Sequence, residues 1–314
     1  MGQGIVEYGG GRVNVAGGGV TGNHPPMARP PRRGAPPHRP ADRSGEKSRR
    51  YHDRVARQYD AIYDDPYWGF HDELTWRLIK PHLPRDASAA CADLGCGTGK
   101  WGLKLLKSGY ATTFVDHAGA MVEQAREKAA ALGPKVKRAS FVVADIVDLP
   151  ELPSQSFALS VAMGDPLSIC SDPQRAANEM YRISVPGGVV IATADNKLAA
   201  LDHYVERGNL DALEEFVRSG RTRWLTPDER EQFELTTLTP ASLRRLFERA
   251  GFQVLSVSGK TIIPVRQNKH LLTYPNATER LVRLEEELAS DPSAAARAGH
   301  LQVVARRPQD AAKV

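Results

Sequence analysis

The fold class predicted by the sequence is α/β, with a doubly wound, seven-stranded and mostly parallel sheet. Short apolar segments alternate with amphipathic segments of helical period between residues 46 and 308. The apolar segments are continuous runs, which is typical of strands that are buried on both faces of a sheet. Several helical segments begin with proline or end before glycine, so their limits are marked. Together these observations predict a sheet that helices cover on both faces.

The seven strands are expected at the apolar runs 89–94, 111–115, 141–145, 157–163, 189–194, 252–257 and 301–305. The helices that alternate with them are expected at 100–107, 119–131, 173–183, 240–250 and 278–289. Two more helices are expected ahead of the first strand, one over residues 46–63, which Pro66 would close, and one over residues 72–82. Asp172 and Thr239 each precede a proline and are expected to cap the helices that follow.

The chain is expected to form one folded domain at residues 46–308, between two tails. Residues 1–45 are rich in glycine, proline and arginine and hold few large apolar side chains, so this tail is expected to be disordered. Residues 46–84 would form an N-terminal helical lid, and residues 309–314 a short C-terminal tail.

One long segment, residues 196–238, interrupts the alternation after the fifth strand. It has the pattern of two short amphipathic helices, at 197–207 and 210–219. An insertion of this length in a compact domain is usually functional. We expect it to lie on the substrate side, over the carboxyl edge of the sheet, where open α/β proteins bind ligands.

Charge and composition exclude several classes of protein. The net charge of +5 lies in the first 50 residues, which hold nine Lys or Arg and three acidic residues, whereas the remainder holds 33 basic and 34 acidic residues. The body therefore lacks the basic face that nucleic-acid binding requires, and the tail is expected to be a solvated leader. No window is apolar enough to span a membrane. Three cysteines and scattered histidines predict neither disulfides nor a metal site, which fits the cytoplasm.

A glycine-rich turn follows the first expected strand. Residues 95–99 (Gly-Cys-Gly-Thr-Gly) join the strand directly to a helix, so bare backbone can approach a ligand at a helix N-terminus. Gly97, Gly99 and Gly102 also spell G-x-G-x-x-G, a pattern found in dinucleotide sites. Asp93 stands just before the turn, where a carboxylate would repel a pyrophosphate but suits a cationic amino group. Asp116 ends the next strand and could accept ribose hydroxyls in either kind of site.

Four segments resemble class I S-adenosylmethionine (SAM)-dependent methyltransferases. Residues 92–99 are similar to motif I of that family, and residues 116–122 to its D-x-S-x-x-M segment, with Ala118 at the small hydroxyl position. Residues 143–146 resemble the third acidic site, and residues 184–188 the L-K-P-G-G turn without its lysine. The resemblance covers roughly residues 50–308 and is nearest to the ubiquinone- and menaquinone-biosynthesis methyltransferases. It implies a Rossmann-like fold and SAM as cofactor.

The resemblance also implies a cofactor site made of Tyr59, Asp93, Gly95, Cys96, Gly97, Gly99, Asp116, His117, Met121, Asp145, Ile146, Met163 and Gly164. By this resemblance the Asp93 carboxylate would lie near the amino group of the cofactor, either in direct contact or with a water molecule between them. Asp116 would hold the ribose, and Asp145 with Ile146 would meet the adenine edge. Tyr59 belongs to an aromatic segment that would fold over the cofactor, although plain core packing is an equal alternative for it.

The acceptor side is less defined. Asp165 follows the fourth strand in Gly-Asp-Pro-Leu, which resembles the D-P-P-Y signature of amino-directed nucleic-acid methyltransferases without its second proline and aromatic residue. Asp165 and His203 are the catalytic candidates, and Asn196 and Tyr204 are expected near the same methyl position. Two alternatives stay open: Asp165 could cap a helix, and His203 could be a surface residue.

The leading hypothesis is methyl transfer to a small-molecule acceptor by a monomer or homodimer, without a membrane or nucleic-acid partner. RNA or protein methylation recruited by the basic tail, a non-catalytic SAM-binding module and an NAD-dependent oxidoreductase remain as alternatives.

Overall fold

The computed structural model describes residues 43–223 and 232–309. Most of the tail expected to be disordered, residues 1–45, therefore lies outside the described residues, as do Trp224 and nearly all of the expected C-terminal tail at 309–314. Residues 43–45 were assigned to the tail, but they are the first turn of helix α1 (Arg43–Val55). Among the described residues, no helix combines the length and the apolar character needed to cross a membrane.

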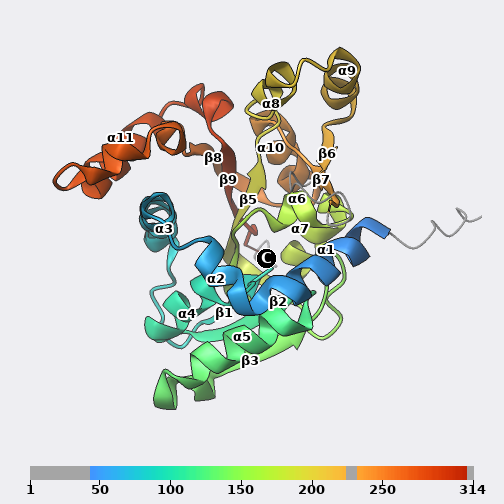
Figure 1. Cartoon of the computed structure of the whole chain (residues 1–314). Coiled ribbons are helices and arrows are strands. Elements are labelled where there is room, and N and C mark those ends of the chain that lie inside the picture. The colour runs from blue at the N-terminus through green and yellow to red at the C-terminus, as the bar shows by residue number, and fades with distance from the viewer. Residues whose placement is uncertain (1–42, 224–231, 310–314) are drawn as a thin grey trace, which may run out of the picture. The chain divides into compact units, whose positions relative to one another are not determined.

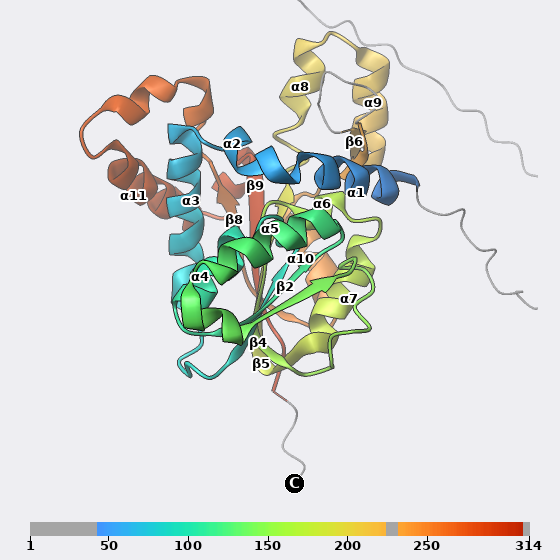
Figure 2. The ribbon, with the colours of Figure 1, turned by 60° about the horizontal axis from the view of Figure 1, so that its bottom comes forward.

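Seven strands form one sheet in the order β3-β2-β1-β4-β5-β9-β8. The strands are β1 (Ala90–Leu94), β2 (Ala111–Asp116), β3 (Ala139–Val143), β4 (Phe157–Ala162), β5 (Ser184–Asp195), β8 (Gln253–Lys260) and β9 (His300–Arg306). All neighbours pair in parallel except β9, which is antiparallel to both β5 and β8. This confirms the predicted seven-stranded, mostly parallel α/β sheet (Figures 1 and 2).

Helices cover both faces of this sheet. They are α4 (Lys100–Lys107), α5 (Gly119–Ala130), α7 (Pro173–Ile183) and α10 (Pro240–Arg249). Successive residues of β1 point to opposite faces: Cys91 packs with Trp101 of α4, and Ala92 belongs to the cluster that holds Met180 of α7 and Phe247 of α10. Because both faces are buried, β1 is apolar at every position except Asp93, as the continuous run predicts.

The N-terminal helices differ from the prediction at one proline. Helix α1 leads through a 3-10 turn (Ala56–Gln58) into α2 (Tyr59–Ile62) and then α3 (Pro66–Ile79). Pro66 was expected to end a helix, but it begins α3. The Asp65 carboxylate accepts the backbone N–H of Tyr67 at 2.8 Å and caps the helix, and a proline at the first helical position gives up no hydrogen bond.

Two insertions rise from the carboxyl edge of the sheet (Figure 1). The first holds the expected pair of helices, α8 (Leu201–Glu206) and α9 (Leu210–Ser219), and a small hairpin that was not expected, β6 (Arg221–Arg223) with β7 (Glu234–Thr236). The second joins β8 to β9 and contains α11 (Ala277–Ala289). Helix α11 packs against α3 through an apolar cluster centred on Phe70 and Val282, so this second insertion closes over the N-terminal helices.

Candidate active site

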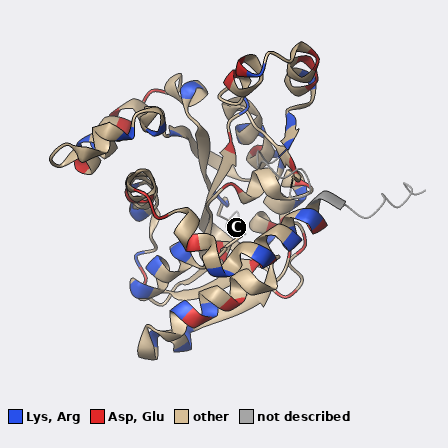
Figure 3. Cartoon of the chain, in the orientation of Figure 1, with Lys and Arg blue, Asp and Glu red and all other residues tan. Residues whose placement is uncertain are grey.

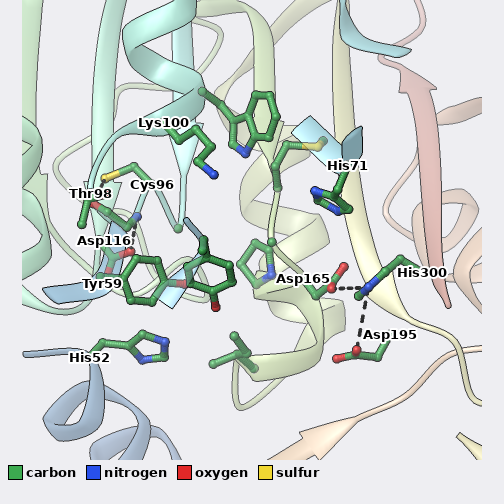
Figure 4. A pocket seen from close by; sticks show the side chains of 18 of the residues that line it. His52, Tyr59, His71, Cys96, Thr98, Lys100, Asp116, Asp165, Asp195 and His300 are labelled. Atoms are coloured by element: carbon green, nitrogen blue, oxygen red, sulfur yellow. Dashed lines mark hydrogen bonds and ion pairs between the residues drawn. The ribbon is translucent and has the colours of Figure 1, made fainter. Parts of the chain in front are cut away.

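A cavity of about 660 Å³ lies where β1, β2, β4 and β5 end (Figure 4). Gly95, Asp116, Met163 and Asp195, which end or follow these four strands, all line it. The N-terminal helices close one side with aromatic rings, among them Tyr59. Ligand cavities in proteins span about 300–1,000 Å³, so this one has room for a nucleoside cofactor and a second small molecule.

The glycine turn forms one wall of the cavity. Gly97 has φ of +52°, a conformation that side chains other than glycine rarely adopt. A Cβ atom placed on Gly97 would meet nothing closer than the Tyr59 ring, at 3.9 Å, so this position faces open space in the cavity. Gly95, in contrast, is packed: a Cβ there would lie 2.7 Å from Cβ of Pro166. The turn therefore offers bare backbone to a ligand at Gly97.

Asp116 is fixed at the cavity wall by two backbone groups. The N–H of Gly97 donates to its Oδ2 at 2.8 Å, and the N–H of Ala118 donates to its Oδ1 at 2.9 Å. Each carboxylate oxygen keeps a further lone pair, so the group can accept two more hydrogen bonds from a ligand. A ribose with two adjacent hydroxyls fits such an acceptor.

Asp93 lies just outside the cavity lining. Its Oδ2 accepts the N–H of Gly102 at 2.6 Å, while its Oδ1 is buried with no hydrogen-bond partner among the described residues. Burial raises the pKa of Asp93 to about 7, and the Gly102 hydrogen bond opposes that rise only in part. A buried carboxylate oxygen of this kind normally has a partner. A cationic ligand group or a bridging water beside it would therefore be favourable.

Of the thirteen residues predicted to bind cofactor, ten line the cavity: Tyr59, Gly95, Cys96, Gly97, Asp116, His117, Asp145, Ile146, Met163 and Gly164. Asp93, Gly99 and Met121 do not. Gly99 is the N-terminal cap of α4, and Met121 is fully buried in a core cluster with Val55 and Ala118. These two residues shape the site through packing, without facing the cavity.

Four ionisable residues lie at the same edge of four neighbouring strands and form what we call the polar row: Asp165, Asp195, His300 and Lys260. Asp165 follows β4 with a left-handed φ of +62°, and its Oδ2 lies 2.6 Å from Nδ1 of His300. Asp195 Oδ1 lies 3.9 Å from the same nitrogen (Figure 4). His300 on β9 stands opposite Asp195 on β5 and opposite Lys260 on β8, so the antiparallel strand joins the row.

The two carboxyl groups of the row differ in acidity. Burial raises the pKa of Asp165, but the charge and hydrogen bond of His300 outweigh it and lower the pKa overall. Burial and then the negative charge of Asp165 raise the pKa of Asp195 to about 7. Burial lowers the pKa of His300, yet the carboxylates of Asp165 and Asp195 raise it overall. Asp165 is therefore an anion bound to imidazolium, while Asp195 can gain or lose a proton near neutral pH.

The same three residues could also be considered as metal ligands. One ligand atom from each of Asp165, Asp195 and His300 lies within 4.8 Å of the other two. In this structure Nδ1 of His300 lies 2.6 Å from Oδ2 of Asp165, so the two groups share a hydrogen bond.

Three other predicted acceptor-side residues lie away from the cavity. His203 is on α8, where its ring pairs with Arg207 four residues along the helix, so its position does not support the predicted role as a base. Asn196 is buried and donates to three backbone carbonyls of the segment 295–298. The Tyr204 hydroxyl bonds to Thr222 at 2.7 Å. Each of them stabilises the insertions.

Three members of the polar row, Asp195, Lys260 and His300, were not predicted. A partial signal exists, because Asp195 directly follows and His300 directly precedes an apolar expected strand, whereas Lys260 lies three residues beyond one. These positions indicate a common site only once β9 is known to run antiparallel between β5 and β8. That pairing turns three separate strand ends into one site.

Comparison with known proteins places this geometry in a family. The family described as "Methyltransferase domain" matches residues 91–188, from β1 into β5. The tRNA 5-carboxymethoxyuridine methyltransferase of Escherichia coli K12 is 23% identical over 225 residues, covering 71% of this chain and 81% of the relative. The demethylmenaquinone methyltransferase of Protochlamydia amoebophila is 26% identical over 210 residues, covering 63% of this chain and 83% of the relative.

Among solved structures, a SAM-dependent methyltransferase from Methanosarcina mazei has the same fold. It superposes with a TM-score of 0.54 at 20% identity and covers 74% of this chain and 98% of that one. The matched segment 91–188 contains the glycine turn, Asp116 and Asp145. Together with the seven-stranded sheet and its cavity, these matches identify the chain as a class I SAM-dependent methyltransferase.

Proposed function

We propose that this enzyme transfers the methyl group of SAM to a small-molecule acceptor, which binds in the part of the cavity beside the polar row. The observation that carries this proposal is the composition of the cavity walls. One end holds the glycine turn, and the other end holds Asp195, Lys260 and His300 together with Trp68 and His71 of α3. A nucleoside and a second small molecule would thus lie end to end in one cavity.

The cofactor end fits SAM on its own geometry. Asp116 would accept the ribose hydroxyls, and Asp145 with Ile146 would lie at the adenine. The free oxygen of Asp93 would attract the amino group, directly or through water. When bound, SAM supplies a methyl group on a sulfonium, which is already activated for attack. The chain must therefore align the acceptor and exclude water.

Aromatic side chains exclude water from the cavity. The Tyr59 and Tyr63 rings lie 4.9 Å apart, and the Tyr63 and Trp68 rings lie 4.7 Å apart, so they form a continuous apolar wall from α2 to α3. All three residues line the cavity. In such a low-dielectric site the interactions between charged groups and the acceptor are stronger than in water.

Asp195 is the residue suited to accept a proton from the acceptor. A general base works best when its pKa lies near the operating pH, and burial beside Asp165 gives Asp195 such a pKa. Asp165 stays ionised because it is bound to His300, so the two carboxyl groups have separate tasks. Asp165 would position His300 through the 2.6 Å contact, while His300, at 3.9 Å, would act on Asp195 through its charge. An oxygen or nitrogen acceptor that carries a proton fits this arrangement.

The charge distribution supports a small acceptor over RNA. One relative acts on tRNA by its name, so RNA is the alternative to consider. Acidic and basic residues are interleaved along α5, where Figure 3 shows both colours, whereas α1 holds five basic residues and two acidic ones. From residue 51 onward the chain carries 33 basic and 34 acidic residues. A tRNA-binding surface requires several clustered positive charges.

The test is label transfer from SAM. The full-length protein would be incubated with methyl-labelled SAM and either a metabolite extract or total tRNA. We expect label in a small molecule and none in RNA. Titration calorimetry with SAM provides the companion measurement, in which Asp116→Asn should weaken binding by about 10- to 100-fold, since hydrogen bonds to a charged acceptor contribute ~1.5–3 kcal/mol. Label in tRNA alone would overturn the proposal.

A further inference from the structure

Lys260 is a fully buried lysine in the cavity wall. It is 1% exposed at the end of β8, and it lines the cavity. Its Nζ donates to Oγ1 of Thr75 at 3.2 Å, and that hydroxyl in turn donates to the His71 carbonyl at 2.7 Å. No carboxylate among the described residues lies within ion-pair distance of Nζ. An ammonium group has three donors, so this one has capacity left for a ligand.

The nearby carboxylates already have other partners. Asp72 accepts Nζ of Lys100 at 2.6 Å, and Asp165 binds His300 at 2.6 Å. Both influence Lys260 only through space: burial lowers its pKa, while the charges of Asp165 and Asp72 raise it. Burial therefore disfavours the charged form of Lys260, and a bound anion would favour that form by offsetting the cost of the buried charge.

The backbone that carries Lys260 is strained and held in place. Thr261, the next residue, has φ of +60°, which is unusual for a β-branched side chain. The Glu285 carboxylate of α11 accepts the N–H of Ile262 at 3.0 Å and the N–H of Ile263 at 2.7 Å, and so fixes the turn. Strain of this kind costs ~1–3 kcal/mol and collects at functional sites. Asp165, which also has a positive φ, lies on the same cavity.

Lys260 also has a defined place relative to Asp195. Lys260 pairs with His300 across β8 and β9, and His300 pairs with Asp195 across β9 and β5. Directly paired residues point to the same face of a sheet. Neighbouring strands are ~4.8 Å apart, so the backbones of Lys260 and Asp195 are separated by ~10 Å. Lys260 and Asp195 therefore lie on the same face of the sheet, two strands apart, so one small molecule could contact both.

We propose that Lys260 binds a carboxylate of the methyl acceptor, so that the acceptors are small carboxylate-bearing molecules. This proposal rests on the proposed function and names the substrate class of the same site. A carboxylate oxygen would accept the hydrogen bonds that Lys260 can still donate, and its negative charge would offset that of the lysine. The methyl-accepting atom is a different group of the same molecule, placed near Asp195, two strands away from Lys260. Charge-assisted hydrogen bonds would make the carboxylate the anchor of the acceptor.

Binding of a matched pair of probes tests the proposal without knowledge of the natural acceptor. Benzoate and benzamide have the same shape and differ by one charge. Each would be titrated into the full-length protein saturated with S-adenosylhomocysteine, and the heat of binding measured. We expect benzoate to bind at least tenfold more tightly than benzamide. Equal affinities, or no binding of benzoate at tens of millimolar, would overturn the proposal.

Two variants test whether the preference for benzoate depends on Lys260. Lys260→Met keeps the length of the side chain and removes its charge, and should abolish the preference for benzoate while leaving benzamide unchanged. Lys269→Met is the control, because Lys269 is an exposed lysine of the same insertion, paired with Asp65. A Lys260→Met protein that keeps the preference contradicts the proposal. If this variant does not fold, the comparison of the two probes on the wild-type protein still decides.

An activity measurement separates this proposal from the proposed function. A metabolite extract would be divided on an anion exchanger at pH 7 into retained and unretained fractions, and each incubated with labelled SAM and the enzyme. We expect label transfer only to the retained, anionic fraction. Transfer to the unretained fraction would overturn the carboxylate proposal and leave small-molecule methylation standing. Transfer to neither would contradict the proposed function, while the benzoate titration still tests Lys260.

Discussion

The turn between β1 and α4 offers a substitution whose effect on folding can be measured apart from its effect on SAM binding. Gly97 has φ of +52°, and a Cβ added to it would meet only the Tyr59 ring, at 3.9 Å. Alanine in this left-handed conformation costs ~1–2 kcal/mol. For a folded region of this size we expect Gly97→Ala to lower the melting temperature by ~2–8 °C, since each kcal/mol shifts it by ~2–4 °C.

The effect on binding should be larger. The new methyl group would project into the cavity at the cofactor end, and an extra methyl group in a fitted site costs ~1–3 kcal/mol. This corresponds to a loss of SAM affinity of about 5- to 150-fold. Gly133→Ala is a matched control, because Gly133 has φ of +64° and open space around its Cβ, and it does not line the cavity.

Two measurements on both variants decide the outcome. Thermal unfolding should show similar destabilisation for Gly97→Ala and Gly133→Ala, whereas titration calorimetry should show weakened SAM binding for Gly97→Ala alone. If Gly97→Ala binds SAM as tightly as the wild-type protein, the cofactor does not lie against the turn and the assignment of this wall is wrong. Weakened binding by Gly133→Ala would mean that backbone strain itself, at any position, disturbs the site.

Three further substitutions have defined outcomes. Gly102→Ala should lower the unfolding free energy by more than about 3 kcal/mol in denaturant titration, because its Cβ would lie 2.3 Å from Cε1 of Phe114. Phe70→Ala should cost ~3–5 kcal/mol in the same assay, since this ring is 0% exposed between α3 and α11; a loss below about 1 kcal/mol would contradict that packing. His300→Gln should move the acidic limb of kcat/KM to higher pH by about 1–3 units. A cation 3.9 Å from Asp195 lowers the pKa of that carboxyl, and at an effective dielectric of ~20 the pair interacts by ~4 kcal/mol before solvent screening. An unchanged limb, measured with the acceptor found by label transfer, would exclude Asp195 as the base.

The cofactor end of the cavity could be predicted because each of its parts is local in sequence. The glycine turn directly follows β1, and Asp116 and Asp145 end or closely follow the next two strands. Consecutive parallel strands deliver their carboxyl ends to one edge, so residues just after them meet without any further information. Strand positions were predictable for the same reason, since continuous apolar runs mark strands that are buried on both faces.

One error had a local physical cause. Pro66 was predicted to end a helix, because a proline inside a helical pattern removes a backbone donor. The pattern is equally compatible with a helix start, and the capping carboxylate of Asp65 decides between them. The role of His203 as a base stays a prediction. Its helix α8 contributes no residue to the cavity lining, and a sequence alone does not show which face of an insertion meets a cavity.

Three of the four residues of the polar row could not be predicted from the sequence, for a topological reason that also bears on specificity. Asp195, His300 and Lys260 come from β5, β9 and β8, and only the antiparallel placement of β9 between the other two brings them together. The glycine turn and Asp116 belong to the parallel half of the sheet, and the matched methyltransferase segment ends at residue 188, before any of the three. Under the proposed function, the residues that would bind SAM and the three that would meet the acceptor are therefore carried by separate strands. This separation is consistent with relatives of this chain whose names specify tRNA in one case and demethylmenaquinone in another. It follows that exchanging residues at β8 and β9, and not in the glycine turn, should change which acceptor the enzyme uses while SAM binding is kept.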